Sequence, residues 1–459
     1  MVMTAYSNLA QTNGEITPER MEKAFDGNIC RCTGYRPILD ACKSLTNGSD
    51  IEDLVGKQNC SSFSSCENRT PAFPDFLEDH SVGSTKFEMN GKTWFRPACL
   101  SEVFDLLQMP GARLVVANTS VGIYKNDDAT VLIELQHVTE LLQCSQENQK
   151  SITIGSSNSI AKLIEALSQV KANSEASGAN ARYMEAMITH CERIANVHVR
   201  NVGSIGGNLA LAKSKGFVSD LATVLLGANA TVTLQSKEKS RKISMEEFLA
   251  TPEWNQEIMR SITVPFLDDD QTYNSYKTAI RPVNSHALIN AAFLATVKGK
   301  VISDVTLAFG GVQEADQVGS RAVLAKKTAE FLNGKELNSD NLREALKILS
   351  EEIQVAGSYK RESRQKLVAS FFYKFFLSLA PIPDRLKSAP VDLFKTRPTN
   401  KSTQQFTSSE ELAPVNKPVP KTTGPALASG SGVFIDDLPA GDCVFGALVT
   451  SSCARAKIS

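Results

Sequence analysis

The order of hydrophobic patterns between residues 257 and 379 most strongly constrains the fold of this chain. Four stretches alternate as strands, at Glu257–Val264, Thr272–Lys277, Ala291–Lys298 and Ser303–Phe309. Three stretches with helical spacing follow them, at Thr328–Leu332, Asn341–Ile353 and Gln365–Leu379. A run of strands succeeded by a run of helices favours an α+β fold with an antiparallel sheet.

Residues 86–268 also combine both kinds of element. Short strands are predicted at Thr93–Phe95, Arg113–Val116, Val131–Ile133, Ser151–Ile154 and Ala230–Leu234. Helices are predicted at Leu100–Leu107, Ile160–Leu167, Ala181–Ile194 and Ser219–Leu226, with a glycine-rich loop at Val202–Asn208. The chain has 459 residues, which is enough for about two to four domains of roughly 100–200 residues each.

A small helical unit is predicted at the amino-terminal end. Thr17-Pro18-Glu19 has the composition of a helix start, with an N-cap, a proline at the first helical position and an acid in the first turn. Cys30 and Cys32 follow, and then a further helix at about Pro37–Leu45. Two thiolates one residue apart can ligate an iron–sulfur cluster, but such a cluster needs about four ligands. Spacing alone therefore favours a pair of ordinary thiols.

Two polar stretches, Asn47–Ser84 and Ala380–Gly424, are rich in turn-forming residues and are predicted to be linkers. After the second, Gly432–Asp437 and Cys443–Val449 are predicted to be strands of a further domain. That domain is expected to lack a core, because the chain stops at Ser459.

Charge and hydropathy exclude several kinds of partner. The formal net charge of -1 gives no global basic field to attract nucleic acid or a membrane surface. No apolar run approaches the roughly 18 residues needed to span a bilayer, and Met1–Gly14 lacks the apolar region of a signal peptide. The ten cysteines are irregularly spaced, which argues against a disulfide framework. We therefore expect a cytoplasmic protein.

Two stretches of small residues could hold a phosphate-bearing ligand. In Val202–Asn208, the glycines let backbone N–H groups approach a phosphate, and Ser204 and Asn208 add side-chain hydrogen bonds. In Leu114–Gly122, a buried strand ends in a small polar loop. An ordinary turn explains either stretch as well, so both interpretations stay open.

Two charged residues could serve a flavin. Asp220 could accept a hydrogen bond from a sugar hydroxyl, and Lys277 could stabilise negative charge on a reduced ring. Taken singly, each is instead expected to be a surface charge. The five histidines have no metal-binding spacing, and no G-x-S-x-G or P-loop string occurs, so hydrolase and kinase functions have no support.

Four strings occur in a fixed order along the chain. They are Leu114–Gly122, Val199–Leu209 with Ser219-Asp220-Leu221, Ser429–Pro439, and before these Gly27–Ile38 with its two cysteines. Each resembles a segment of the xanthine dehydrogenase and aldehyde oxidase family of molybdenum hydroxylases. Arg182–Met187 and similar strings make the plant aldehyde oxidases the most similar subgroup.

The resemblance implies an FAD-binding domain of the PCMH or vanillyl-alcohol-oxidase type. An antiparallel-sheet flavoprotein subdomain would follow it, and the remnant of a small all-helical 2Fe–2S domain would precede it. The resemblance further implies that FAD is bound by Leu114, Val115, Val116, Ala117, Asn118, Thr119, Ser120, Val121, Ile194, Ser204, Ile205, Gly206, Gly207, Asn208, Asp220, Met259 and Lys277.

Cys30 and Cys32 would be two of the four ligands of a 2Fe–2S cluster. The family's other two cysteines precede the residues equivalent to Val2 and Met3, so the ligand set is expected to be incomplete here. In complete enzymes, a molybdopterin centre hydroxylates an aldehyde or a purine. Electrons then pass through two 2Fe–2S clusters to FAD and on to O₂ or NAD. Ile194 replaces the phenylalanine that xanthine dehydrogenases place beside the flavin, which argues against NAD.

The resemblance divides the chain into domains and linkers. Residues 1–56 would be a truncated 2Fe–2S domain, 57–85 a linker, 86–268 the FAD-binding domain, 269–380 a CO dehydrogenase flavoprotein-like domain, 381–410 a linker and 411–459 the start of the molybdopterin domain. FAD binding is the activity that we expect this chain to keep, with no molybdopterin bound. The resemblance also implies a homodimer. A free-standing flavoprotein subunit and a non-catalytic, partner-binding fragment are the alternatives.

Overall fold

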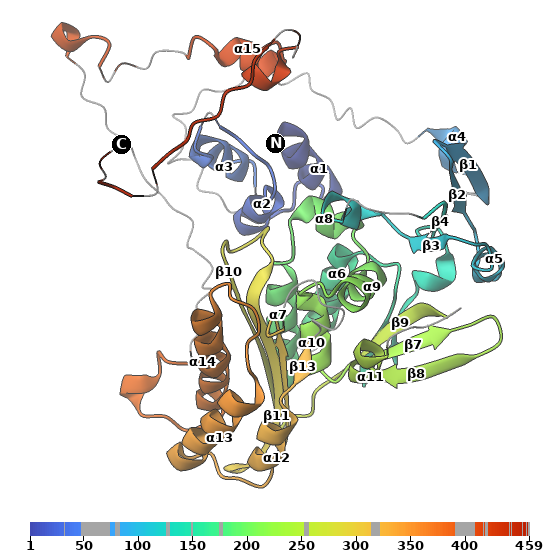
Figure 1. Ribbon diagram of the computed structural model, residues 1–459, viewed down its shortest axis with the longest axis vertical. Coiled ribbons are helices and arrows are strands. Elements are labelled where there is room, and N and C mark those ends of the chain that lie inside the picture. Colours follow the sequence, from blue (N-terminus) through green and yellow to red (C-terminus); the bar gives the residue numbers. More distant parts are fainter. Residues whose placement is uncertain are drawn as a thin grey trace. The chain divides into compact units, whose positions relative to one another are not determined.

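The computed structural model describes residues 1–31, 33–46, 74–78, 83–124, 129–147, 150–173, 178–251, 257–313, 322–390, 409–415, 417, 421–439, 441, 443–451, 453–455 and 457. The chain divides into two compact units, Met1–Thr396 and Arg397–Ser459, which are described separately. The first unit contains the three sheets and most of the helices (Figure 1).

The first unit begins with three short helices, α1 (Val2–Gln11), α2 (Pro18–Ala24) and α3 (Arg36–Lys43). Thr17 is the N-cap of α2 as predicted, and its hydroxyl accepts a hydrogen bond from the Arg20 amide. The core of this helical unit is small and consists of Ala5, Ile16, Met21 and Phe25. It relies on the neighbouring domain for further contacts, as described below.

The first sheet has the strand order β1-β2-β4-β3, with β4 parallel to both of its neighbours. The short helix α4 (Asp75–Glu78) precedes it, and α5 (Leu100–Leu106) packs its buried face against β4 residues. The strands are β1 (Thr85–Met89), β2 (Lys92–Arg96), β3 (Ala112–Val115) and β4 (Val131–Glu134). The loop that leaves β3 is the first of the two stretches predicted to hold a phosphate.

The second sheet is antiparallel, with the order β5-β6-β9-β7-β8. Its strands are β5 (Cys144–Glu147), β6 (Ser151–Gly155), β7 (Thr231–Gln235), β8 (Ser240–Ser244) and β9 (Ile258–Pro265). Six helices accompany it, α6 (Ile160–Asn173), α7 (Gly178–Cys191), α8 (Val197–Val202), α9 (Ile205–Lys215), α10 (Asp220–Gly227) and α11 (Met245–Ala250). Together they enclose the largest apolar core of the chain's described part.

The third sheet confirms the predicted antiparallel architecture. Its order is β10-β11-β12-β13, and every pairing is antiparallel. The strands are β10 (Gln271–Ala279), β11 (Ala287–Lys298), β12 (Val301–Gly310) and β13 (Val323–Leu324), followed by α12 (Lys326–Leu332), α13 (Ser339–Glu352) and α14 (Arg361–Leu379). The α+β fold class is therefore confirmed.

Strand β11 is buried on both faces. Ala292 and Leu294 join the core formed by α7 and α10, whereas Ala291, Phe293 and Ala295 join the core formed by α12 to α14. Successive side chains of a strand point to opposite faces, so one strand contributes to both cores. Figure 1 shows α13 and α14 on one side of this sheet and α7 and α10 on the other.

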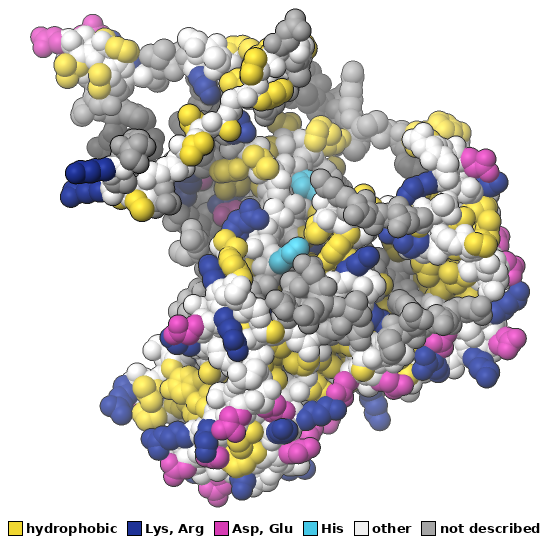
Figure 2. All heavy atoms as spheres, viewed as in Figure 1, with side chains coloured by type: hydrophobic (Ala, Val, Ile, Leu, Met, Phe, Trp, Pro, Cys, Tyr) yellow, Lys and Arg dark blue, Asp and Glu magenta, His cyan; other side chains and the backbone are white. Residues whose placement is uncertain are grey.

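The surface over α13 and α14 is a mixed-charge surface. Exposed ion pairs join Asp340 to Arg343 and Glu362 to Lys366, and Figure 2 shows acidic and basic side chains interspersed around these helices. No helix in the described part of the chain is long and apolar enough to cross a membrane.

The second unit differs from the prediction. Ile435–Asp437 form a 3₁₀ turn, and residues 443–449 have no regular structure, so the two strands predicted at 432–437 and 443–449 are wrong. The apolar side chains Val444, Phe445, Leu448 and Val449 are almost fully exposed. An alternating pattern forms a strand only where a neighbouring strand and an apolar surface receive it, and the described residues of this unit supply neither.

Candidate functional site

The glycine-rich stretch begins a helix and is not the predicted long loop. Only Gly203 and Ser204 separate α8 from α9, and Gly206, Gly207 and Asn208 lie in the first turns of α9. Ser204 is the N-cap, and its hydroxyl accepts from the Gly207 amide at 3.0 Å. The hydrogen bond outweighs the low helix propensity of two glycines at a helix start, where the backbone amides are otherwise unpaired.

The start of α9 is fixed against the end of β6. The amide of Ile205 donates to the carbonyl of Asn158 at 2.9 Å, and that of Gly206 donates to the carbonyl of Ser156 at 2.8 Å. A Cβ at Gly206 would lie 3.0 Å from both Cβ and the carbonyl oxygen of Ser156. The close approach explains why glycine occupies this turn.

The loop after β3 lies beside this turn. Asn118 takes a left-handed conformation (φ 52°), and its side-chain oxygen accepts from Nη2 of Arg113 at 2.9 Å. A Cβ at Gly203 would lie 3.8 Å from Oγ1 of Thr119. The two stretches predicted to bind one cofactor are therefore adjacent, although about 85 residues separate them in sequence.

Met259, another predicted FAD contact, joins the same region through Ser156. The Ser156 hydroxyl donates to the carbonyl of Met259, while the Ser156 carbonyl accepts from Gly206. Both residues are buried, Ser156 at 4% and Met259 at 5% exposure. This serine links β9 to the start of α9 and was not identified in the sequence.

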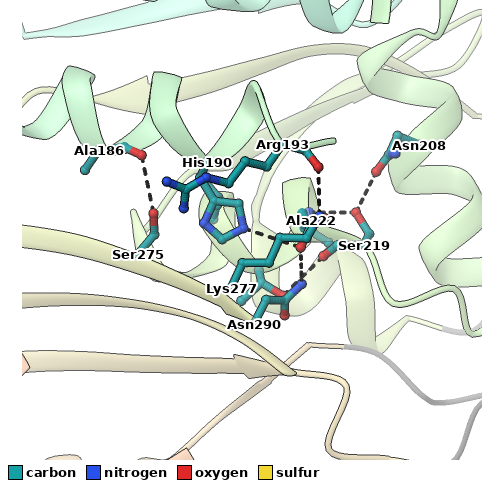
Figure 3. Close-up of polar contacts among 12 residues, drawn as sticks. Ala186, His190, Arg193, Asn208, Ser219, Ala222, Ser275, Lys277 and Asn290 are labelled. Carbon is teal, nitrogen blue, oxygen red and sulfur yellow. Dashed lines mark hydrogen bonds and ion pairs between the residues drawn. The ribbon is translucent and has the colours of Figure 1, made fainter. Parts of the chain in front are cut away.

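Asp220 is the centre of a buried polar network, and Figure 3 labels its partners His190, Lys277 and Asn290. It is the first residue of α10, whose N-cap Ser219 also donates to Oδ1 of Asn208 at 2.5 Å. The Asp220 carboxylate accepts from Nδ2 of Asn290 at 2.7 Å and lies 3.4 Å from Nε2 of His190. The prediction that Asp220 would be a surface charge is wrong, because it is only 6% exposed.

Lys277 completes the network and is likewise no surface charge. Its Nζ lies 2.7 Å from Oδ2 of Asp220 and donates to the carbonyl of Arg193 at 2.9 Å. Arg193 precedes Ile194, which is 7% exposed. Lys277 thus contacts both Asp220 and the backbone of the residue before Ile194, and the role of all three in binding FAD stays a prediction.

Acid is expected to destabilise the chain through Asp220. Burial raises the pKa of this carboxyl, but the His190 hydrogen bond and the Lys277 charge outweigh burial and lower it from 3.8 to about 2. A lowered folded-state pKa contributes stability above pH ~4, and that stability is lost as pH falls through about 2. At pH 3 the expected loss is about 1 kcal/mol.

Urea unfolding at a series of pH values measures this loss. In Asp220→Asn the corresponding part of the acid sensitivity should be absent, whereas the exposed Asp340→Asn should keep the wild-type profile. Identical pH profiles for the wild type and Asp220→Asn would contradict the assignment.

The helical unit contacts the region of Ile194 through Arg200. One guanidinium nitrogen of this buried arginine donates to the carbonyl of Ile194 at 2.8 Å, and another donates to Oδ2 of Asp26 at 3.2 Å. Lys23 and Glu192 add an ion pair of 2.8 Å across the same interface. The loop before Cys30 is therefore held next to the predicted flavin region.

The predicted cluster ligands are only partly visible. Cys30 is half-buried, its amide donates to the hydroxyl of Tyr35 at 3.1 Å, and its Sγ lies 3.3 Å from Oγ1 of Thr33. Cys32 lies outside the described residues. Within the described part of the chain, no group of three or more His, Cys, Asp or Glu residues could hold a metal ion.

Three comparisons with known proteins bear on these residues. Residues 85–267 match the family described as the FAD binding domain in molybdopterin dehydrogenase. Residues 274–379 match the CO dehydrogenase flavoprotein C-terminal domain, and residues 1–43 match a 2Fe-2S binding domain. The two loops and the Asp220–Lys277 pair all lie within the first two matches.

Plant oxidases are among the curated relatives of this chain. The indole-3-acetaldehyde oxidase of Arabidopsis thaliana is 35% identical over 480 residues, which cover 97% of this chain and 35% of that protein. The abscisic-aldehyde oxidase of the same plant is 32% identical over 507 residues, covering 100% of this chain and 37% of that protein. The chain thus spans little more than a third of the length of these relatives.

The residues present fit a bound FAD. The glycine turn leaves no room for a side chain near Ser156, and the neighbouring groups supply amide, hydroxyl, carboxylate and ammonium partners for a polar cofactor. The fit to a 2Fe–2S cluster rests on Cys30 and on the match of residues 1–43.

Solved structures share the fold. Quinoline 2-oxidoreductase from Pseudomonas putida 86 superposes with a TM-score of 0.52 at 20% identity, covering 66% of this chain and 100% of that one. A chain of a Cu,Mo-CO dehydrogenase superposes with a TM-score of 0.50 at 18% identity, and the match covers 60% of this chain and 93% of that one. With three matched domains and plant aldehyde oxidases as relatives, the chain belongs to the molybdenum hydroxylase family and carries its FAD-binding and 2Fe–2S-binding domains.

Proposed function

We propose that this chain is the electron-transfer segment of an aldehyde-oxidase-type enzyme. Electrons arriving from a 2Fe–2S cluster would pass to FAD and then to O₂ or NAD. The observation that carries the proposal is that the two predicted FAD loops are adjacent, and that Asn208 of the second is hydrogen-bonded to Ser219, next to the buried Asp220–Lys277 pair. Bound FAD supplies the redox chemistry, and the chain supplies binding, orientation and charge.

Each polar group has a role that follows from its contacts. Ser204 and Asn208 at the start of α9 would bind phosphate oxygens, since the amino-terminal end of a helix favours negative charge. Asp220 would accept a hydroxyl of the cofactor's sugar or ribityl portion. Lys277, held by two hydrogen bonds, would stabilise negative charge at the ring.

The contact through Arg200 supports passage of electrons from the helical unit. It joins Asp26, four residues before Cys30, to the backbone of Ile194. The proposal extends to residues 86–268 and 269–380 as the two FAD-domain parts and to Cys30 and Cys32 as cluster ligands. It also includes aldehyde hydroxylation by the complete enzyme, a homodimeric state and a cytosolic location.

A charge placed among the phosphate-binding groups tests the proposal. Asn208→Asp is isosteric, and a carboxylate in the first turns of a helix does not harm the helix. It should nevertheless lower FAD affinity by about tenfold or more, because the carboxylate repels the pyrophosphate in a partly desolvated site. Flavin absorption retained after desalting, relative to protein, measures the effect.

Asn341→Asp is the matched control, since Asn341 also lies in the first turn of a capped helix, α13. It should retain as much flavin as the wild type. A folded wild-type chain that never takes up FAD, or equal retention by Asn208→Asp, would refute the proposed site. Reduction of the bound flavin by NADH would decide between NAD and O₂ as the acceptor.

A further inference from the structure

A cavity of about 390 Å³ lies between α6, α7 and β10. It is lined by Lys171, Ala181, Arg182, Glu185, Ala186, Thr189, His190, Arg193, Asn274 and Ser275. None of the residues predicted to contact FAD or the cluster is among them. A volume of this size is in the range of small-molecule sites, and nothing in the proposed electron-transfer role uses it.

One face of α7 makes the cavity basic. Arg182, Glu185 and Thr189 recur every three or four residues on α7, so their side chains point the same way, and Arg193 lies two residues beyond the end of the helix. Lys171 and Glu185 form an ion pair and neutralise one another. Arg182 is exposed and makes no ion pair or hydrogen bond with the chain's described residues. A positive charge therefore remains at the cavity mouth.

His190 is a buried polar side chain at the inner end of the cavity. It is 2% exposed, and its Nδ1 has no hydrogen-bond partner among the described residues. Its Nε2 faces Asp220, whose carboxylate oxygens can only accept, so Nε2 carries a proton. Figure 3 shows the His190 ring near the side chains of Arg193 and Lys277.

A buried nitrogen without a partner calls for a ligand or water that supplies one. A neutral imidazole with a proton on Nε2 presents Nδ1 as an acceptor, which matches a hydroxyl or N–H donor. The guanidinium group of an arginine can donate two parallel hydrogen bonds to one carboxylate or phosphate group. Ala181 and Ala186 add apolar surface to the lining.

We propose that this cavity binds a small organic oxyanion, a carboxylate or a phosphate ester, that also carries a hydroxyl or N–H group. Arg182 and Arg193 bind the anionic oxygens, and Nδ1 of His190 accepts from the donor group. The site is distinct from the predicted FAD contacts and is connected to them through two contacts, that of His190 with Asp220 and that of the Arg193 carbonyl with Lys277.

Calorimetric titration of the purified chain tests this site with three probes of similar size. 4-Hydroxybenzoate and 4-hydroxyphenyl phosphate carry the anion and the hydroxyl, whereas 4-hydroxybenzyl alcohol lacks the anion. At least one anionic probe should bind about tenfold more tightly than the alcohol, because a charge-assisted bidentate contact is lost in the alcohol. Comparing the two anions distinguishes a carboxylate site from a phosphate site.

Arg182→Gln should weaken binding of the preferred anion by about tenfold, and it is not expected to affect folding because Arg182 is exposed. Arg343→Gln on α13 is the matched control, since its exposed ion pair lies in another layer. In ¹⁵N-histidine spectra, the ring nitrogens of His190 should shift on binding. Equal affinity for all three probes, no binding, or unchanged affinity in Arg182→Gln would each overturn the proposal.

Discussion

Replacing Lys277 with methionine is expected to lower the free energy of unfolding by about 3–5 kcal/mol. Methionine keeps the approximate length of the side chain but leaves Asp220 without its cation. Both groups are almost fully enclosed, with side-chain exposures of 2% and 7% and an N–O distance of 2.7 Å. An uncompensated buried carboxylate is costly, whereas solvent can replace the partner of an exposed one.

Urea unfolding followed by circular dichroism at neutral pH measures this effect. The matched control is Lys237→Met, which breaks an equally short ion pair with Asp105 on the surface, where the two side chains are 69% and 65% exposed. The control should leave the unfolding midpoint unchanged, because exposed pairs contribute little. Similar midpoints for both variants would show that Asp220 and Lys277 are not paired in a buried site.

Replacing Gly310 with alanine is expected to destabilise the chain by about 1–3 kcal/mol through overpacking. A Cβ at this position would overlap Oδ1 of Asn290 and Oγ1 of Thr223. These two atoms are hydrogen-bonded at 2.9 Å, and Asn290 in turn donates to Asp220. The substitution should therefore also lower FAD retention, since it displaces the amide that orients Asp220.

Gly83→Ala is the control, because no atom of the described residues lies within 4 Å of a Cβ there. An alanine at an unobstructed site is neutral or slightly stabilising, since it restricts the unfolded chain. Thermal unfolding and flavin content of both variants provide the two readouts. Wild-type stability in Gly310→Ala would mean that Asn290 and Thr223 can move apart at no cost.

Local sequence patterns predicted the regular elements well. The helix predicted at Ser219–Leu226 is α10 at Asp220–Gly227, and the strand predicted at Ala291–Lys298 is β11 at Ala287–Lys298. Such elements are encoded by the periodicity of neighbouring residues. The loop predicted at Val202–Asn208 is wrong from Ile205 onward, because the glycines favour a turn but the cap at Ser204 starts a helix there.

Partners that are distant in sequence could not be predicted in this way. Asn290 and Lys277 reach Asp220 from 70 and 57 positions away, and His190 from 30. No periodic pattern or motif distinguishes these residues. The burial of Asp220 and Lys277 depends on how the sheet and helices pack, which local sequence does not encode. The family resemblance pointed to Asp220 and Lys277. It did not point to Asn290 or His190, which contact Asp220.

Because β11 is buried on both faces, we expect the segments of residues 85–267 and 274–379 to unfold as one cooperative unit. Asp220 belongs to the segment of residues 85–267, yet Lys277 and Asn290, which satisfy it, belong to the segment of residues 274–379. Neither half alone holds a complete polar network, and separating them would expose one apolar face of β11. An evolutionary exchange of either half between relatives would therefore have to preserve three residues contributed by both.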